Sequence, residues 1–178
     1  MQLTRWALLA PLFASVASCS SADGTFRLDA VRLEDDGSKL RAVLSIHNGR
    51  ISSAYTYSAP RGIRWDEATR TLTLALVEQD CPPSAGTLCS HYVFPSYARI
   101  APREDVDVAI DLPRTLTRIV ASSEGKAAAE TADLTTTAHL VVDVAWAEAP
   151  VDSSVRGEDP RTAVRAAERE VFRGEWVR

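Results

Sequence analysis

The sequence lacks the features that mark several large classes of protein. Over 178 residues, 20 lysine and arginine residues stand against 24 aspartate and glutamate residues, so the basic excess typical of nucleic-acid-binding proteins is absent. Apolar residues make up 46% of the chain and charged residues 25%, which are ordinary globular values and exclude a wholly disordered chain. We therefore expect a single folded domain that does not bind nucleic acid.

Motifs of common enzyme sites are also missing. The sequence holds no Gly-x-Ser-x-Gly, no glycine-rich phosphate-binding pattern, no His-Glu-x-x-His and no calcium-loop spacing. These absences favour a protein that uses no cofactor and no metal. A catalytic site assembled from distant residues stays open as the alternative.

No apolar run is long enough to cross a bilayer, which takes about 20 residues. The longest run, residues 6–14, follows the single charge of Arg5, is broken by Pro11 and ends in small residues. A positive charge, a short apolar stretch and small residues in that order are typical of an export signal. We predict a signal peptide over residues 1–18.

The segment Val16-Ala17-Ser18-Cys19 resembles the lipobox of bacterial lipoproteins. The resemblance implies a diacylglyceryl group on the Cys19 sulfur, cleavage before Cys19 and acylation of the new amine. Two or more acyl chains on one residue give stable membrane anchoring. Because residue 20 is serine and not aspartate, the resemblance favours the outer membrane in a cell with two membranes. Ordinary secretion, with cleavage after Ala17, is the alternative.

Cys81 and Cys89 are the other two cysteines. With Cys19 assigned to lipid through that resemblance, they remain as a pair in an oxidising compartment, which predicts a disulfide. A zinc site would need more ligands, and a redox pair would favour Cys-x-x-Cys. In the chain-entropy model, closing so small a loop contributes about 2–3 kcal/mol.

Alternation of apolar and polar residues dominates the chain from Thr25 onward and is typical of β-strands. It covers residues 26–33, 40–47, 72–76, 106–112 and 134–146. Because turn signals and not helices separate these runs, we predict an all-β fold, an antiparallel two-sheet β-sandwich that resembles immunoglobulin-like domains in pattern. We expect a tether over 19–24, the sandwich over 25–148 and a linker over 149–158.

The periodicity changes after the linker. Asp159 suits an N-cap and Pro160 a first helical position, while Ala163, Ala167 and Val171 recur at a spacing of four. We therefore predict a short C-terminal helix within residues 159–178, with Gly174 as its stop.

The Pro82–Leu88 loop and two groups of residues are candidate contact surfaces. Tyr55 and Tyr57 share one face of a strand and could contact an envelope protein or a glycan. The other group is a row of arginines spaced by four, which we expect to be solvated or to lie on anionic lipid headgroups. It consists of Arg161, Arg165, Arg169 and Arg173.

Histidines and aspartates supply the remaining candidates. We expect His47, His91 and His139 to be surface residues. Asp105, Asp107 and Asp111 share a strand face, which we interpret as a solvated sheet edge. The expected function is a lipid-anchored, non-enzymatic binding or structural module of the cell envelope. The alternative is an envelope hydrolase or metal-dependent enzyme that brings these acids and histidines together.

Overall fold

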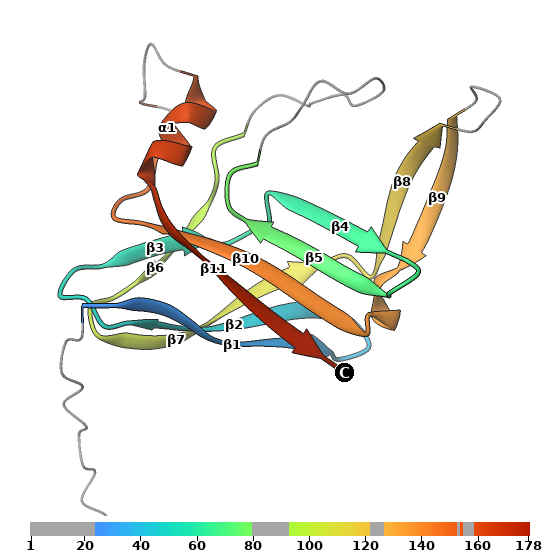
Figure 1. Ribbon diagram of the computed structural model, residues 1–178, viewed down its shortest axis with the longest axis horizontal. Coiled ribbons are helices and arrows are strands. Elements are labelled where there is room, and N and C mark those ends of the chain that lie inside the picture. The colour runs from blue at the N-terminus through green and yellow to red at the C-terminus, as the bar shows by residue number, and fades with distance from the viewer. Residues whose placement is uncertain (1–23, 80–92, 122–126, 153, 155–158) are drawn as a thin grey trace, which may run out of the picture.

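The structure, a computed structural model, describes residues 24–79, 93–121, 127–152, 154 and 159–178 (Figure 1). Several of the sequence-based expectations fall outside these residues. They are the signal peptide, the lipobox with Cys19, the Cys81–Cys89 disulfide, the Pro82–Leu88 contact loop and His91.

Strands make up most of the described chain, and the prediction of an all-β fold with one short helix near the C-terminus is confirmed. The elements are β1 (Phe26–Asp35), β2 (Leu40–Asn48), β3 (Ala54–Tyr57), β4 (Gly62–Asp66), β5 (Thr71–Leu76), β6 (Tyr97–Ile100), β7 (Glu104–Leu112), β8 (Thr115–Ala121), β9 (Ala127–Asp133), the 3-10 turn η1 (Leu134–Thr136), β10 (His139–Ala147), α1 (Pro160–Ala167) and β11 (Glu168–Val177).

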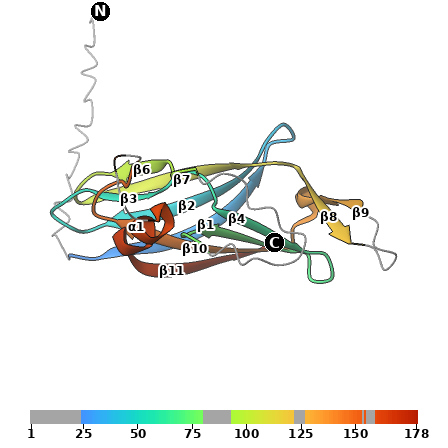
Figure 2. The ribbon, with the colours of Figure 1, turned by 90° about the horizontal axis from the view of Figure 1, so that it is seen from above.

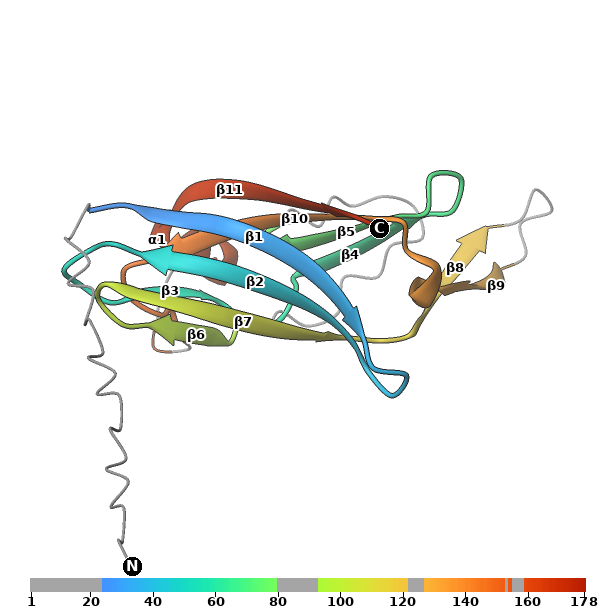
Figure 3. The same cartoon turned by 90° about the horizontal axis from the view of Figure 1, so that it is seen from below.

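Two sheets face each other (Figure 3). The smaller has the order β1-β2-β7 and is antiparallel throughout. In the larger sheet β10 is central: β11 pairs along one edge, and β5 and then β3 pair along the other. β4 extends the sheet beyond β5, and β6 extends it beyond β3.

The core lies between these sheets and follows from the alternation in the sequence. The inward side chains of β2 and of β10 are almost completely buried, and each such aliphatic side chain contributes about 1.5–3 kcal/mol through loss of apolar surface to water. They include Leu40, Leu44 and Ile46 from β2 and Leu140, Val142 and Val144 from β10.

Local features of β1 and of the β4–β5 hairpin also match the sequence. The phase change in the first strand predicts a bulge, and the register of β1 against β2 shifts between Leu28 and Ala30. The apolar runs at residues 63–65 and 72–76 flank residues 66–70 as the arms of a hairpin flank its loop, and β4 and β5 form that antiparallel pair.

One pairing in the larger sheet departs from the antiparallel prediction. β5 and β10 run parallel, from Thr71 opposite His139 to Leu76 opposite Val144. Parallel neighbours need a long connection, and here the intervening chain builds β6 to β9 before it returns. A pairing between segments so far apart leaves no local sequence signal.

The polar, alanine-rich composition of residues 122–130 predicts a loop or a weak helical turn, and this prediction is wrong for residues 127–130. Residues from Ala127 onward form β9, which pairs with β8 from Thr115 opposite Asp133 to Ala121 opposite Ala127. Alanine has little preference for strands, so the pairing with β8 decides its conformation. Figure 2 shows this two-stranded sheet extending away from the sandwich.

The C-terminal prediction is correct only in its first half. Asp159 caps α1 by accepting a hydrogen bond from the backbone N–H of Arg161, as expected. The helix ends at Ala167, and residues 168–177 form β11 along the edge of β10. The sandwich therefore includes this strand, and the predicted helix over 159–178 is too long.

Gly174 is not the stop of a helix but a point of close approach between the two sheets. It lies in β11 where that strand packs on β1, and a Cβ atom placed there would lie 2.4 Å from Val31 Cγ2 and 2.6 Å from Leu28 Cδ2. A Cβ atom fits there only if the side chains of Val31 and Leu28 shift, so glycine lets the sheets close along the β1–β11 side.

Replacing Gly174 with alanine tests this packing. We expect Gly174→Ala to lower the free energy of unfolding by about 1–3 kcal/mol through overpacking. Val171→Ala, on the exposed face of the same strand, serves as the control and changes stability by less than about 0.5 kcal/mol. Urea unfolding measures both.

The Val31→Ala background makes the test specific. Removing the two methyl groups of Val31 frees the space that a Cβ atom at position 174 would occupy, so the added cost of Gly174→Ala should shrink. An equal cost in both backgrounds would show that the contact with Val31 does not matter.

Candidate functional site

Charged side chains on the outer face of the smaller sheet are paired across strands. Asp111 lies opposite Arg41 and accepts a hydrogen bond from its Nε at 2.9 Å. Asp107 lies opposite Ser45 and bonds both the Ser45 hydroxyl at 2.6 Å and Arg32 Nη2 at 2.7 Å. The predicted aspartate row on β7 is thus a solvated edge in which each carboxylate has a cross-strand partner.

Pairing lowers the pKa of these exposed carboxyls. The pKa of Asp107 lies below its ordinary value because the Ser45 hydroxyl and then Arg32 donate to its charged form. The hydrogen bond from Arg41, followed by the charge of Lys39, does the same to the pKa of Asp111. Both carboxyl groups are therefore charged near neutral pH, and neighbouring basic side chains offset their negative charge.

The two described histidines contact carboxylates on different sheets. His47 Nδ1 lies 2.6 Å from Asp105 Oδ1 across β2 and β7, and His139 Nε2 lies 3.4 Å from Glu175 Oε2 across β10 and β11. The prediction that His47 is a surface residue is wrong, because neighbouring strands bury it to 6% exposure. Each described histidine therefore lies beside one carboxylate, and the two pairs lie on different sheets and do not form one cluster.

A half-buried hydrogen-bond network joins β3 to the start of β11. The Tyr57 hydroxyl donates to Glu168 Oε1 at 2.5 Å, and the Glu78 backbone N–H donates to the same oxygen at 2.5 Å. The Tyr57 ring stacks on Tyr97 with ring centroids 5.3 Å apart. Burial raises the pKa of Glu168 above its ordinary value despite both donors, and burial likewise raises the pKa of Tyr57.

Glu78 extends this network with a buried ion pair. Its carboxylate, 3% exposed, lies 3.2 Å from Arg61 Nε. Arg61 also donates from Nη1 to the backbone carbonyl of Val93 at 2.9 Å. These contacts tie the chain on either side of the segment 80–92 to the end of the sandwich where β11 begins.

The structure does not keep either the tyrosine pair or the arginine row as one exposed surface. Tyr57 is 1% exposed and belongs to the hydrogen-bonded network, whereas Tyr55, on the same strand, is half-buried. The predicted arginine row is divided because Arg161 and Arg165 lie on α1 while Arg169 and Arg173 lie on β11. No single face of a helix carries all four.

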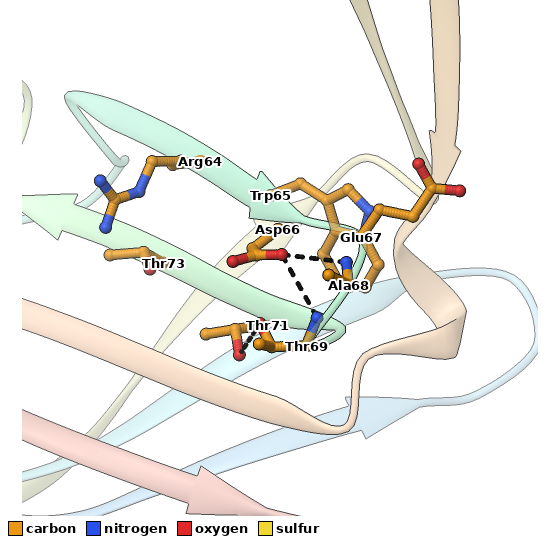
Figure 4. A pocket seen from close by; sticks show the side chains of 8 residues that line it. All are labelled: Arg64, Trp65, Asp66, Glu67, Ala68, Thr69, Thr71 and Thr73. Atoms are coloured by element: carbon orange, nitrogen blue, oxygen red, sulfur yellow. Dashed lines mark hydrogen bonds between the residues drawn. The ribbon is translucent and has the colours of Figure 1, made fainter.

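An open groove lies on the outer face of β4 and β5 (Figure 4). It has a volume of about 580 Å³. Arg64 lies directly opposite Thr73, and Asp66 lies opposite Thr71. We call this the β4–β5 groove; its lining residues are Arg64, Trp65, Asp66, Glu67, Ala68, Thr69, Thr71 and Thr73.

Arg64 is the basic side chain of the β4–β5 groove. Asp66 accepts hydrogen bonds from the backbone N–H groups of Ala68 at 2.9 Å and Thr69 at 3.2 Å, so its carboxylate holds the turn. Arg64 is exposed and forms no ion pair with another described residue. Figure 4 shows its guanidinium extended beside Thr73.

A smaller hollow of about 250 Å³ continues the groove toward β10 and β11 and shares Arg64 and Thr73 with it. There Arg173 binds Asp143 through two hydrogen bonds of 2.7 and 3.0 Å. Cross-strand register places Arg173, Asp143 and Ala75 in one row. The face thus offers a free guanidinium, threonine hydroxyls and a paired arginine, which suit a ligand with carboxylate or hydroxyl groups.

Sequence reasoning missed this groove. The only sequence pattern that could have indicated the groove is the alternation of Thr71 and Thr73 with leucines. These residues lie on one arm of the hairpin, and Arg64 lies on the other. That pattern is typical of any solvated strand face. It does not show that Asp66 bonds the backbone of its own turn and forms no ion pair with Arg64.

Comparison of the chain with protein-family models, with curated proteins and with solved structures gives no match. Over the described residues, no group of three histidine, cysteine, aspartate or glutamate side chains could hold a metal ion. The helix in that part of the chain is too short and too polar to cross a bilayer.

The Tyr57–Glu168 hydrogen bond can be tested by removing one oxygen atom. We expect Tyr57→Phe to lower the free energy of unfolding by about 1.5–3 kcal/mol, because the buried hydroxyl donates to a carboxylate. Tyr55→Phe is the matched control and should change stability by less than about 0.5 kcal/mol. Equal stability of the two variants in urea unfolding would contradict a structural role for the network.

Proposed function

We propose that the protein is a lipid-anchored, non-enzymatic binding module of the cell envelope. The observation that carries this proposal is the lipobox-like segment ending at Cys19, placed a few residues before the first strand. Thioether-linked diacylglycerol and an acylated amine at Cys19 would hold the domain at a membrane surface.

The arrangement of charge supports a binding role for the groove. On the smaller sheet Asp107 and Asp111 have basic or hydroxyl partners, so these carboxylates are already paired within the protein. The β4–β5 groove instead presents Arg64 beside the hydroxyl of Thr73, while its carboxylates, Asp66 and Glu67, lie toward the turn (Figure 4). A protein or glycan of the envelope that carries carboxylate groups has the chemistry to bind there.

The anchor is tested by metabolic labelling with a clickable fatty acid. We expect the full-length protein to incorporate the label and Cys19→Ser to lose it, because the acyl chains need the Cys19 thiol and the amine that cleavage exposes. Ser20→Ala is the matched control and should keep the label. Equal labelling of Cys19→Ser and the wild type would overturn the anchor.

Binding through the groove is tested by chemical cross-linking in cells and purification of the anchored protein from membranes. We expect Arg64→Glu to lose a cross-linked partner that the wild type retains, because the new carboxylate repels acidic groups. Lys39→Glu makes the same charge change in the turn between β1 and β2 and should leave the partner bound. An unchanged set of partners with Arg64→Glu would remove the groove from the proposal.

A further inference from the structure

The end of the sandwich at which β1 begins carries two short loops that lie together. One loop, residues 49–53, joins β2 to β3, and the other, residues 101–103, joins β6 to β7. The backbone N–H of Arg103 donates to the carbonyl of Arg50 at 3.2 Å, so the loops touch. We call them the tip loops (Figure 1).

A buried asparagine holds both tip loops. Asn48 is fully buried, and its side-chain amide donates to the carbonyl of Ser52 at 3.0 Å and to that of Ala101 at 2.8 Å. The start of the domain is fixed to the same place, because the N–H of Gly24 donates to the Gly49 carbonyl at 3.1 Å. The tip loops and the entry of the chain are therefore one hydrogen-bonded unit.

This unit holds a large apolar side chain in solvent. Ile51 is 80% exposed, the highest value among the large exposed hydrophobic residues of the described chain. Arg103, in the neighbouring loop, is also exposed and has no ion-pair partner among the described residues. Packing within the domain gives no reason for an isoleucine at this position, because nothing in the described part of the chain covers it.

Chain length fixes how far this end can lie from the anchor. Residues between Cys19 and Phe26 span at most about 25 Å when fully extended. The other end of the sandwich carries the turn between β4 and β5 and the projecting β8–β9 sheet (Figure 2). With Cys19 in the bilayer, the end that bears the tip loops is the one next to the membrane.

We infer that the tip loops dock on the phospholipid surface that holds the anchor, with Ile51 inserted among the headgroups and Arg103 against lipid phosphate. The inference rests on the proposed anchor at Cys19. An apolar residue flanked by a cation is the combination that interfacial membrane contacts use. Docking would turn the residue 66–70 end of the β4–β5 groove away from the bilayer.

Tryptophan quenching by brominated phospholipid tests the inference on the full lipidated protein in vesicles. We expect Ile51→Trp to lose fluorescence when ordinary phosphatidylcholine is replaced by its dibrominated form. Val177→Trp is the matched control, since Val177 is 70% exposed at the far end of β11, and it should lose none. The wild-type signal from the native tryptophans is subtracted in both cases.

Flotation of the same vesicles separates the two proposals. Protein that floats with the vesicles, while Ile51→Trp is quenched no more than Val177→Trp, keeps the anchor and overturns the docking. Protein that fails to float overturns the anchor and the inference with it. In the Ile51→Trp background, Arg103→Glu should reduce the quenching because a carboxylate is repelled by lipid phosphate; unchanged quenching would overturn the contact with Arg103.

Discussion

Strand β10 is the element on which the rest of the sandwich depends, because both of its backbone edges are hydrogen-bonded along most of its length. β11 pairs with one edge, and β5 and β3 share the other. Its inward side chains, Leu140, Val142 and Val144, are fully buried. The strand therefore joins the two halves of the larger sheet and supplies the centre of its core face. An unpaired edge on a strand this apolar would expose backbone groups to other chains.

The features predicted correctly from sequence are those encoded within a few residues. Alternation identified β2, β7 and β10, the phase change in the first strand predicted its bulge, and the Asp159-Pro160 pair predicted the start of α1. Each depends on a local rule of side-chain direction or capping. The features missed depend on distant partners: β9 needs β8, and β11 needs the free edge of β10. At the end of α1 the spacing of Ala163, Ala167 and Val171 misled the prediction, because it continued past the helix into a strand.

For polar residues, too, the sequence predicts which face of a strand they lie on but not which distant residues they contact. Sequence alone identified the aspartate row of β7 as a solvated edge, but its cross-strand partners Arg32, Ser45 and Arg41 required the register of the sheet. Alternation predicts that Tyr55 and Tyr57 share a strand face. Tyr57 is nevertheless buried, and its hydroxyl donates to Glu168 at the start of β11. Arg64 has no ion-pair partner among the described residues, and the carboxylate two residues further on, Asp66, accepts hydrogen bonds from its own turn.

The position of β11 in the chain has a consequence for biogenesis. The strand that seals β10 is made from residues 168–177, which follow β10 in the chain only after α1, so the larger sheet closes only once those residues are available. Until those residues arrive, β10 must form against β5, more than sixty residues earlier in the chain, or wait with an open edge. Such non-local pairing is slow to form, and until β11 pairs with it the apolar strand β10 presents an open backbone edge to other chains.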